Sequence, residues 1–118
     1  MAVKIERIYA KQQSEGIRIL IDRVWPRGIS KSDAHIDMWL KEVAPTKSLR
    51  QWFHHDLNKF DAFRNQYIAE LQHNDKQIEA YQTLVEQIRT TNKDVILLYG
   101  AKDTTYNHAV VLRDYLKQ

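Results

Sequence analysis

The sequence predicts one small α/β domain over residues 1–118, in which helices cover a mostly parallel sheet. The length of 118 residues leaves room for one domain but not for two. Short apolar segments with strand-like patterns occur near both ends of the chain, and long segments with helical spacing separate them. Strands that are joined by long helical crossovers favour parallel pairing, which leads to this fold class.

Two strands are expected in the first part of the chain. In residues 3–9 apolar and charged side chains alternate at first, which is typical of a strand with one exposed face. A polar stretch then ends at Gly16, and residues 17–24 are apolar on both faces. Such a strand is expected inside a sheet, and it should end at Trp25-Pro26 because proline cannot donate to a neighbouring strand.

Residues 29–45 follow an ambiguous pattern. Ser30 or Ser32 is a suitable N-cap for a short helix, and Pro45 would mark its end. Trp39 is expected to be buried on this helix. The whole apolar face would consist of Ile36, Trp39, Leu40 and Val43.

Three further helices are expected in the middle of the chain, because apolar side chains recur there at helical spacing. Their expected N-caps are Thr46, Asn58 and either Asn74 or Asp75, with Asp61 in the favourable first turn of the second helix. The apolar positions are Leu49, Trp52 and Phe53, then Phe60, Phe63, Tyr67 and Leu71, then Ile78, Tyr81, Val85 and Ile88.

The end of the chain predicts one strand, one loop and one helix. Residues 95–99 are apolar on both faces, as in a buried parallel strand. A polar loop over residues 100–105 follows, and a helix is expected from Tyr106 onward. The apolar positions of that helix are Ala109, Val110, Leu112 and Leu116.

Composition excludes several classes of protein. The absence of cysteine excludes disulfides, thiolate nucleophiles and cysteine-ligated metals. The chain contains no apolar run of about 20 residues and no apolar leader, so we expect a soluble cytoplasmic protein that does not associate with membranes. The net charge is +3, but acids and bases are interspersed, which by itself is not typical of a nucleic-acid-binding protein. Phosphate-loop, dinucleotide-binding and serine-hydrolase motifs are absent from the sequence.

Chemistry is expected at the carboxyl ends of the strands, where open α/β sheets bind their ligands. Residues 22–31 leave one such end and carry two arginines and a lysine beside a Trp-Pro turn. Residues 100–108 leave another and begin a helix, whose free N–H groups favour an anion. In the alternative interpretation, the basic side chains are solvated or form ion pairs, and His108 is a surface or cap histidine. Asp103, Thr104 or Thr105 would then only cap the helix.

Four motifs along the chain carry a family resemblance. They are RVWPRGISK at 23–31, WLKEVAP at 39–45, LRQWFHHD at 49–56, and LLYGAKD at 97–103 together with NHA at 107–109. In this order and spacing they resemble the domain-of-unknown-function 488 (DUF488) family, in its YeaO-like branch. The resemblance implies a small bacterial α/β protein, and because the family has no established reaction, it supplies positions rather than an activity.

The positions that the resemblance singles out agree with the two strand-end segments. Several relatives outside the branch have cysteines in the last motif, where this chain has 99–101 and 107–109 without any, so thiol chemistry does not carry over. The polar positions are Arg23, Arg27, Lys31, Lys41, Arg50, His55, Asp56, Arg64, Lys102, Asp103, Asn107 and His108.

The leading hypothesis is a basic cleft that binds a small anionic or phosphorylated ligand. Arg27 and Lys102 would hold the anion, and Arg23 would orient it or pair with Asp103. If the protein is an enzyme, which the sequence leaves open, hydrolysis or transfer at a phosphate or carbonyl group is the expected reaction. The expected catalytic residues are His108, Asn107 and Asp103, and the expected ligand-binding residues are Arg23, Arg27, Lys31, Lys102, Arg50, His55 and Asp56.

Two alternatives belong to other classes of function. The basic pI of 9.2 motivates a non-catalytic nucleic-acid-binding or regulatory protein. A metal-dependent enzyme would use His55, Asp56 and His108, although the spacing of the histidines matches no metal motif. The leading hypothesis requires neither a metal nor another cofactor, and the oligomeric state is left open.

Overall fold

A computed structural model describes residues 2–118 and contains one four-stranded sheet, all of it parallel. In the sheet the strands lie in the order β1 (Val3–Arg7), β4 (Val95–Tyr99), β2 (Ile17–Leu20) and β3 (Met38–Trp39). β4 pairs with β1 on one side and with β2 on the other. The predicted parallel α/β fold is therefore confirmed.

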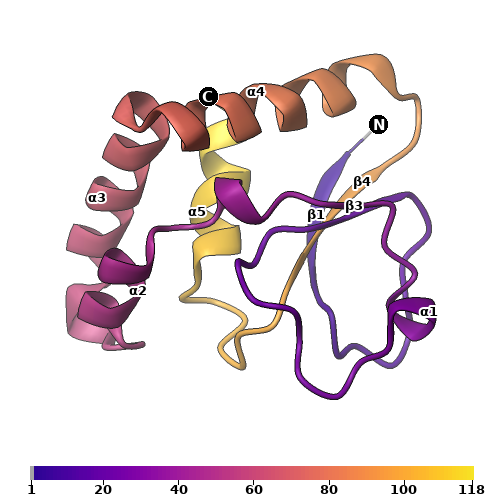
Figure 1. The fold of residues 1–118 in the computed structure, drawn as a ribbon, viewed down its shortest axis with the longest axis horizontal. Helices are drawn as coiled ribbons and strands as arrows, with labels where there is room; N and C mark the ends of the chain where they lie inside the picture. The colour runs from indigo at the N-terminus through magenta and orange to yellow at the C-terminus, as the bar shows by residue number, and fades with distance from the viewer. Residues whose placement is uncertain (1) are drawn as a thin grey trace.

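In the described part of the chain, residues 2–118, five α-helices and two short 3-10 turns accompany the sheet (Figure 1). Within residues 2–118, none of the helices has the length and apolar character needed to cross a membrane. In chain order the elements are α1 (Lys31–Ala34), η1 (Lys41–Val43), α2 (Lys47–Phe53), η2 (Leu57–Lys59), α3 (Phe60–His73), α4 (Asp75–Thr90) and α5 (His108–Leu116).

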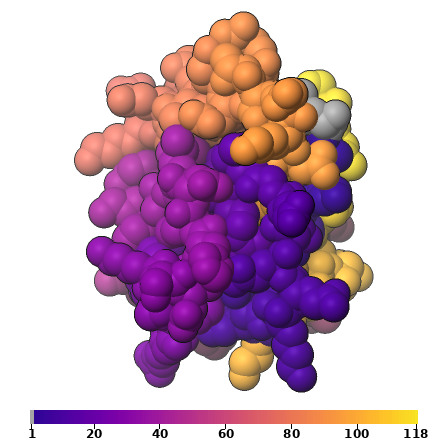
Figure 2. Space-filling view, turned by 90° about the vertical axis from the view of Figure 1, so that its right-hand side faces the viewer, coloured from indigo at the N-terminus to yellow at the C-terminus, as the bar shows by residue number. Residues whose placement is uncertain are grey.

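The two faces of the sheet are covered very unequally. On one face Ile19 and Leu97 belong to the main core, which includes side chains of α2, α3, α4 and α5. Phe53 and Phe63 stack there with ring centroids 4.2 Å apart. On the other face a small cluster around Leu98 is covered by α1 and the loop between β2 and α1. Figure 2 shows this side, where the N-terminal part of the chain forms most of the surface.

Several element boundaries differ from the prediction. β2 ends at Leu20 rather than at residue 24, and Val24 is 66% exposed. The predicted helical face from Ile36 to Val43 is wrong, because the backbone there pairs with β2 instead, with Leu40 N donating to Leu20 O. Trp39 lies on the edge strand β3 and is 36% exposed, so the expectation that it is buried is also wrong. Tertiary pairing has overridden the helical spacing here.

The predicted helix starts were right in part. Ser30, Thr46 and Asn74 each accept a backbone hydrogen bond as N-caps. Asn58 does not cap α3, which begins at Phe60 without a side-chain cap. The last helix begins at His108 rather than at Tyr106. The predicted core faces of the last two helices are also shifted, because the buried faces consist of Gln77, Ala80 and Leu84 in α4 and of Ala109, Val111 and Leu112 in α5.

A buried ion pair connects β1 and β2 on the thinly covered face. Arg18 NH1 lies 2.9 Å from Glu6 Oε2, and both side chains are largely buried. Arg18 Nε also donates to the backbone carbonyl of His35, which ties α1 to the sheet. Partial burial raises the pKa of Glu6, but hydrogen bonds from Ser14 and Arg18 outweigh burial and hold the pKa below its ordinary value of 4.5.

Glu6→Gln should destabilise the protein near neutral pH by about 3 kcal/mol, because it leaves a buried guanidinium without a counter-charge. The folded-state pKa of Glu6 is lowered, so its stabilisation is present above the unfolded-state pKa and is lost as the pH falls through the folded-state value. Urea unfolding at a series of pH values should show that the free energies of unfolding of wild type and the Glu6→Gln variant become equal at acidic pH. Glu86→Gln, at an exposed ion pair, serves as the control and should have little effect. A constant gap between the Glu6 variant and wild type at all pH values would contradict this account.

Gly16→Ala should lower the free energy of unfolding by at least about 2 kcal/mol. Gly16 has φ +146°, and a Cβ there would overlap the carbonyl oxygen of Asp94, which accepts the N–H of Ile17. Gly28 also has a positive φ, +82°, but nothing lies within 4 Å of its added Cβ. Gly28→Ala should therefore cost only about 1 kcal/mol. Equal losses in the two variants would show that the contact with Asp94 is unimportant.

Candidate functional site

A cavity of about 240 Å³ lies at the carboxyl ends of β2 and β4. After β2 the chain crosses the face that α1 covers, whereas after β4 it enters α5 on the opposite face. Adjacent strands whose connections diverge in this way leave a crevice between them. The lining residues are Asp22, Arg23, Val24, Ala44, Pro45, Arg50, Phe53, His55, Phe63, Ala101, Asn107 and His108.

One wall of the cavity consists of residues 43–46 and is held in place by hydrogen bonds with side chains of α3 and α4. The Tyr67 hydroxyl, which is fully buried, donates to Val43 O at 2.6 Å. Burial raises the pKa of Tyr67 and keeps this donor protonated. Gln77 Nε2 donates to Ala44 O at 3.2 Å, and Glu70 accepts hydrogen bonds from Thr46. This wall is therefore preorganised.

Arg23 completes the same wall from the side of β2. Its Nε donates to Pro45 O at 2.9 Å and its NH2 to Ala44 O at 3.0 Å. Its NH1 lies 3.2 Å from Glu42 Oε2. The expected pairing with Asp103 is therefore wrong. With all three nitrogens engaged, the guanidinium of Arg23 holds the wall in place.

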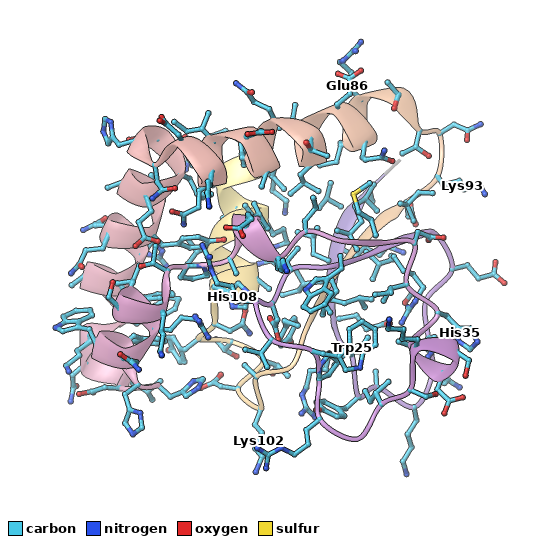
Figure 3. The ribbon with its side chains drawn as sticks, viewed as in Figure 1. Trp25, His35, Glu86, Lys93, Lys102 and His108 are labelled. Atoms are coloured by element: carbon cyan, nitrogen blue, oxygen red, sulfur yellow. The ribbon has the colours of Figure 1, made fainter. Side chains whose placement is uncertain are left out.

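Asp22 and His108 meet at the junction of β2 and α5. Asp22 Oδ2 accepts the backbone N–H of Gly100 at 2.8 Å. His108 Nε2 lies 3.0 Å from Ile21 O, and because a carbonyl can only accept, this nitrogen carries the proton. Asp22 Oδ1 lies 3.1 Å from the same nitrogen but accepts no hydrogen bond within residues 2–118. Figure 3 shows His108 in the interior, between the helical layer and the segment that follows β2.

Arg50 is the second arginine of the lining, and its environment differs from that of Arg23. It lies on α2, which Thr46 caps and which buries Leu49 and Phe53 against the core. Its Nε is buried and lacks a hydrogen-bond partner in the described part of the chain. No carboxylate of residues 2–118 forms an ion pair with its guanidinium. An unpaired guanidinium nitrogen that is removed from water is unfavourable unless a ligand or water supplies an acceptor.

His55 lies at the exposed rim of the cavity, directly after α2. His54 and His55 both have positive φ values, 44° and 54°, and this tight turn brings the chain from α2 to η2. The imidazole of His55 lies 6.0 Å from the ring of Phe53, measured between centroids. Non-glycine residues with positive φ store strain, which is often found near binding sites.

The structure gives Asn107 and Asp103 clear roles in the loop before α5. Asn107 is 2% exposed, and its Oδ1 accepts the N–H of Val110 while its Nδ2 donates to Asp103 O. Asp103 Oδ1 accepts the N–H groups of Thr105 and Tyr106, both at 2.9 Å. These backbone hydrogen bonds, with a smaller contribution from the charge of His55, hold the pKa of Asp103 below its ordinary value. Catalytic roles for Asp103, Asn107 and His108 stay predictions.

Some predicted site residues do not line the cavity. Arg27, Lys31 and Lys102 are exposed, and Figure 3 shows Lys102 at the edge of the molecule, directed away from His108. Asp56 caps η2 by accepting the N–H of Asn58. Of the predicted residues, the cavity brings together Arg23, Arg50, His55, Asn107 and His108.

Asp22, Phe53 and Phe63 are lining residues that the sequence analysis did not select. Asp22 could have been found as the acidic residue that closely follows an inner strand. The alternative metal site is not formed: among residues 2–118, no three histidine, aspartate or glutamate side chains are arranged to hold a metal ion, so His55, Asp56 and His108 do not converge.

A parallel α/β domain with a partly polar cavity at a switch point of its sheet is the class of protein that this geometry defines. The chain belongs to the DUF488 family, since a family model described as "Inactive DUF488-N3 subclade" matches residues 2–118. It is 41% identical to the uncharacterized protein YeaO of Escherichia coli K12, over 99% of this chain and 98% of the relative. It is 34% identical to the uncharacterized protein Rv3073c of Mycobacterium tuberculosis H37Rv, over 97% of this chain and 92% of the relative. No solved structure matches the chain significantly.

Asn107→Ala should lower the free energy of unfolding by about 1–2 kcal/mol, because α5 loses its N-cap and Asp103 O loses a donor. Asn58→Ala is the matched control, since Asn58 is exposed and caps no α-helix. Thermal unfolding of the two variants measures the difference. A stability loss at Asn58 as large as that at Asn107 would contradict the structural role of Asn107.

Proposed function

We propose that the protein is a binding domain for a small anion, which the Arg50 guanidinium holds in the cavity at the ends of β2 and β4. The observation that carries the proposal is the buried, unpartnered Nε of Arg50 in the cavity lining. A guanidinium presents a planar fork of donors that matches a carboxylate or a phosphate. An anion bound there would supply the missing acceptor.

The surroundings of Arg50 support this assignment. The guanidinium of Arg23 already donates hydrogen bonds to Pro45, Ala44 and Glu42. Of the two arginines of the lining, Arg50 is therefore the one that can bind an added anion. The N-terminal end of α5, a nine-residue helix, faces the cavity through His108 and adds a favourable field for an anion. The preorganised wall at residues 43–46 reduces the entropy lost on binding.

Binding without catalysis fits this chain better than an enzymatic role. The matching family model is described as inactive, and the chain has no cysteine that could act as a thiolate nucleophile. The imidazole of His108 is engaged through Nε2 with Ile21 O, and Asn107 is used as a helix cap. The lining residues include no serine, threonine, cysteine or lysine that could act as a nucleophile.

Arg50→Gln should weaken binding of small anions about 10- to 100-fold, because it removes a charge-assisted hydrogen bond worth about 1.5–3 kcal/mol. The measurement is isothermal titration with a panel of acetate, benzoate, sulfate and phosphate. The doubly substituted Arg27→Gln/Lys102→Gln protein is the matched control, because both side chains are basic but lie outside the cavity.

The outcomes of this comparison distinguish two placements of the anion from the case in which no anion binds. Loss of binding in the Arg50 variant alone supports the cavity. Loss only in the Arg27/Lys102 double variant would move the site to the exposed loops and overturn the proposal. Absence of anion binding in the wild-type protein, together with nucleic-acid binding that falls steeply as salt is raised, would favour the nucleic-acid alternative.

A further inference from the structure

We propose that the ligand is a monocarboxylate with an apolar body, rather than a phosphate ester. This inference rests on the proposed binding of an anion by Arg50. It concerns the charge of the ligand's head group and the nature of the rest of the ligand. The evidence comes from the charges that face the cavity and from its apolar walls.

The charges around the cavity disfavour a doubly charged ligand. Arg23 carries a positive charge, but Glu42 lies 3.2 Å away and compensates it. Asp22 carries a negative charge, and within residues 2–118 no lysine or arginine forms an ion pair with it. The titratable side chain beside it is His108, at 3.1 Å, which contributes positive charge only when it is protonated. Arg50 therefore roughly offsets Asp22, and the lining has no excess positive charge when the two histidines are neutral.

A phosphate monoester is unfavourable in this environment. Near pH 8 it carries about two negative charges, whereas Arg50 supplies a single unpaired positive charge. The second charge would face the carboxylate of Asp22, whose Oδ1 is already buried without a hydrogen-bond donor. Like charges close together in a partly buried site repel strongly. A carboxylate satisfies the guanidinium fork and adds no second charge.

The remainder of the lining accommodates an apolar group. Phe53 and Phe63 are both buried in the core and present ring surface to the cavity. Ala44 and Pro45 form the fixed wall, and Val24 lies at the outer side with 66% of its surface exposed. Ligand pockets of this composition bind through apolar contact and use a few polar groups for orientation. An aromatic or branched aliphatic acid would use both kinds of surface.

The test uses three ligands that share one phenyl ring: benzoate, phenylphosphate and neutral benzamide. Titration near pH 8 should show benzoate binding at least about tenfold more tightly than phenylphosphate, and benzamide more weakly than benzoate by a similar factor. Acetate should bind more weakly than benzoate, since it lacks the apolar body.

Asp22→Asn provides the second measurement. It removes the opposing charge but keeps an oxygen for the N–H of Gly100, so the ratio of phenylphosphate to benzoate affinity should rise several-fold. Asp61→Asn is the control, because it makes the same change in net charge on the exposed surface of α3 and should leave the ratio unchanged.

Each result has a defined meaning. Phenylphosphate binding as tightly as benzoate, with Arg50 still required, would overturn the carboxylate inference and leave anion binding intact. Acetate binding as tightly as benzoate would overturn the apolar body alone. Benzamide binding as tightly as benzoate, or no binding by any anion, would overturn both proposals. Circular dichroism of each variant establishes that it is folded before its affinity is compared.

Discussion

The parallel pairing of β4 with both β1 and β2 is the interaction on which the rest of the structure depends. β4 is completely buried and joins two strands whose backbones do not pair with each other in the sheet. Because β2 and β4 lie side by side but lead to opposite faces, their ends create the cavity. The hydrogen bond from Gly100 N to Asp22 Oδ2 continues this pairing beyond the last ladder residues. The position of β4 between β1 and β2 therefore accounts for both the sheet and the cavity.

Periodicity revealed the parallel sheet and most helices, because those features depend on local patterns of burial. It failed between Ile36 and Val43, where an apolar stripe at helical spacing became an edge strand and a 3-10 turn. This segment forms β3 because its backbone pairs with the free edge of β2, a strand that is not adjacent to it in the sequence. Residue type alone also failed to locate the start of α3. Asn58 is a suitable N-cap residue, but it lies within the short turn η2, which Asp56 caps.

The candidate site was predictable in position but not in detail. Both strand-end segments do contribute to the cavity. However, the sequence does not show which arginine has hydrogen-bond partners for all its nitrogens and which has an unpartnered nitrogen. Nothing in the sequence distinguishes Arg23 from Arg50. In the structure, Arg23 donates hydrogen bonds to the carbonyl groups of Pro45 and Ala44 and is therefore part of the cavity wall. Nor does the sequence show the position of the exposed Arg27, whose charge suits an anion but whose side chain lies outside the cavity. Burial and partners, not residue type, select Arg50.

The late position of β4 in the chain also affects how the protein is made. During synthesis β1 and β2 leave the ribosome long before residues 95–99, the segment that both of them need as a neighbour. Until then the two strands present unpaired edges, and Ile19 and Leu20 lack their final covering. Such long-range pairing slows folding and exposes intermediates to aggregation. Nascent chains of this protein should therefore be prone to aggregation until residues 95–99 have emerged.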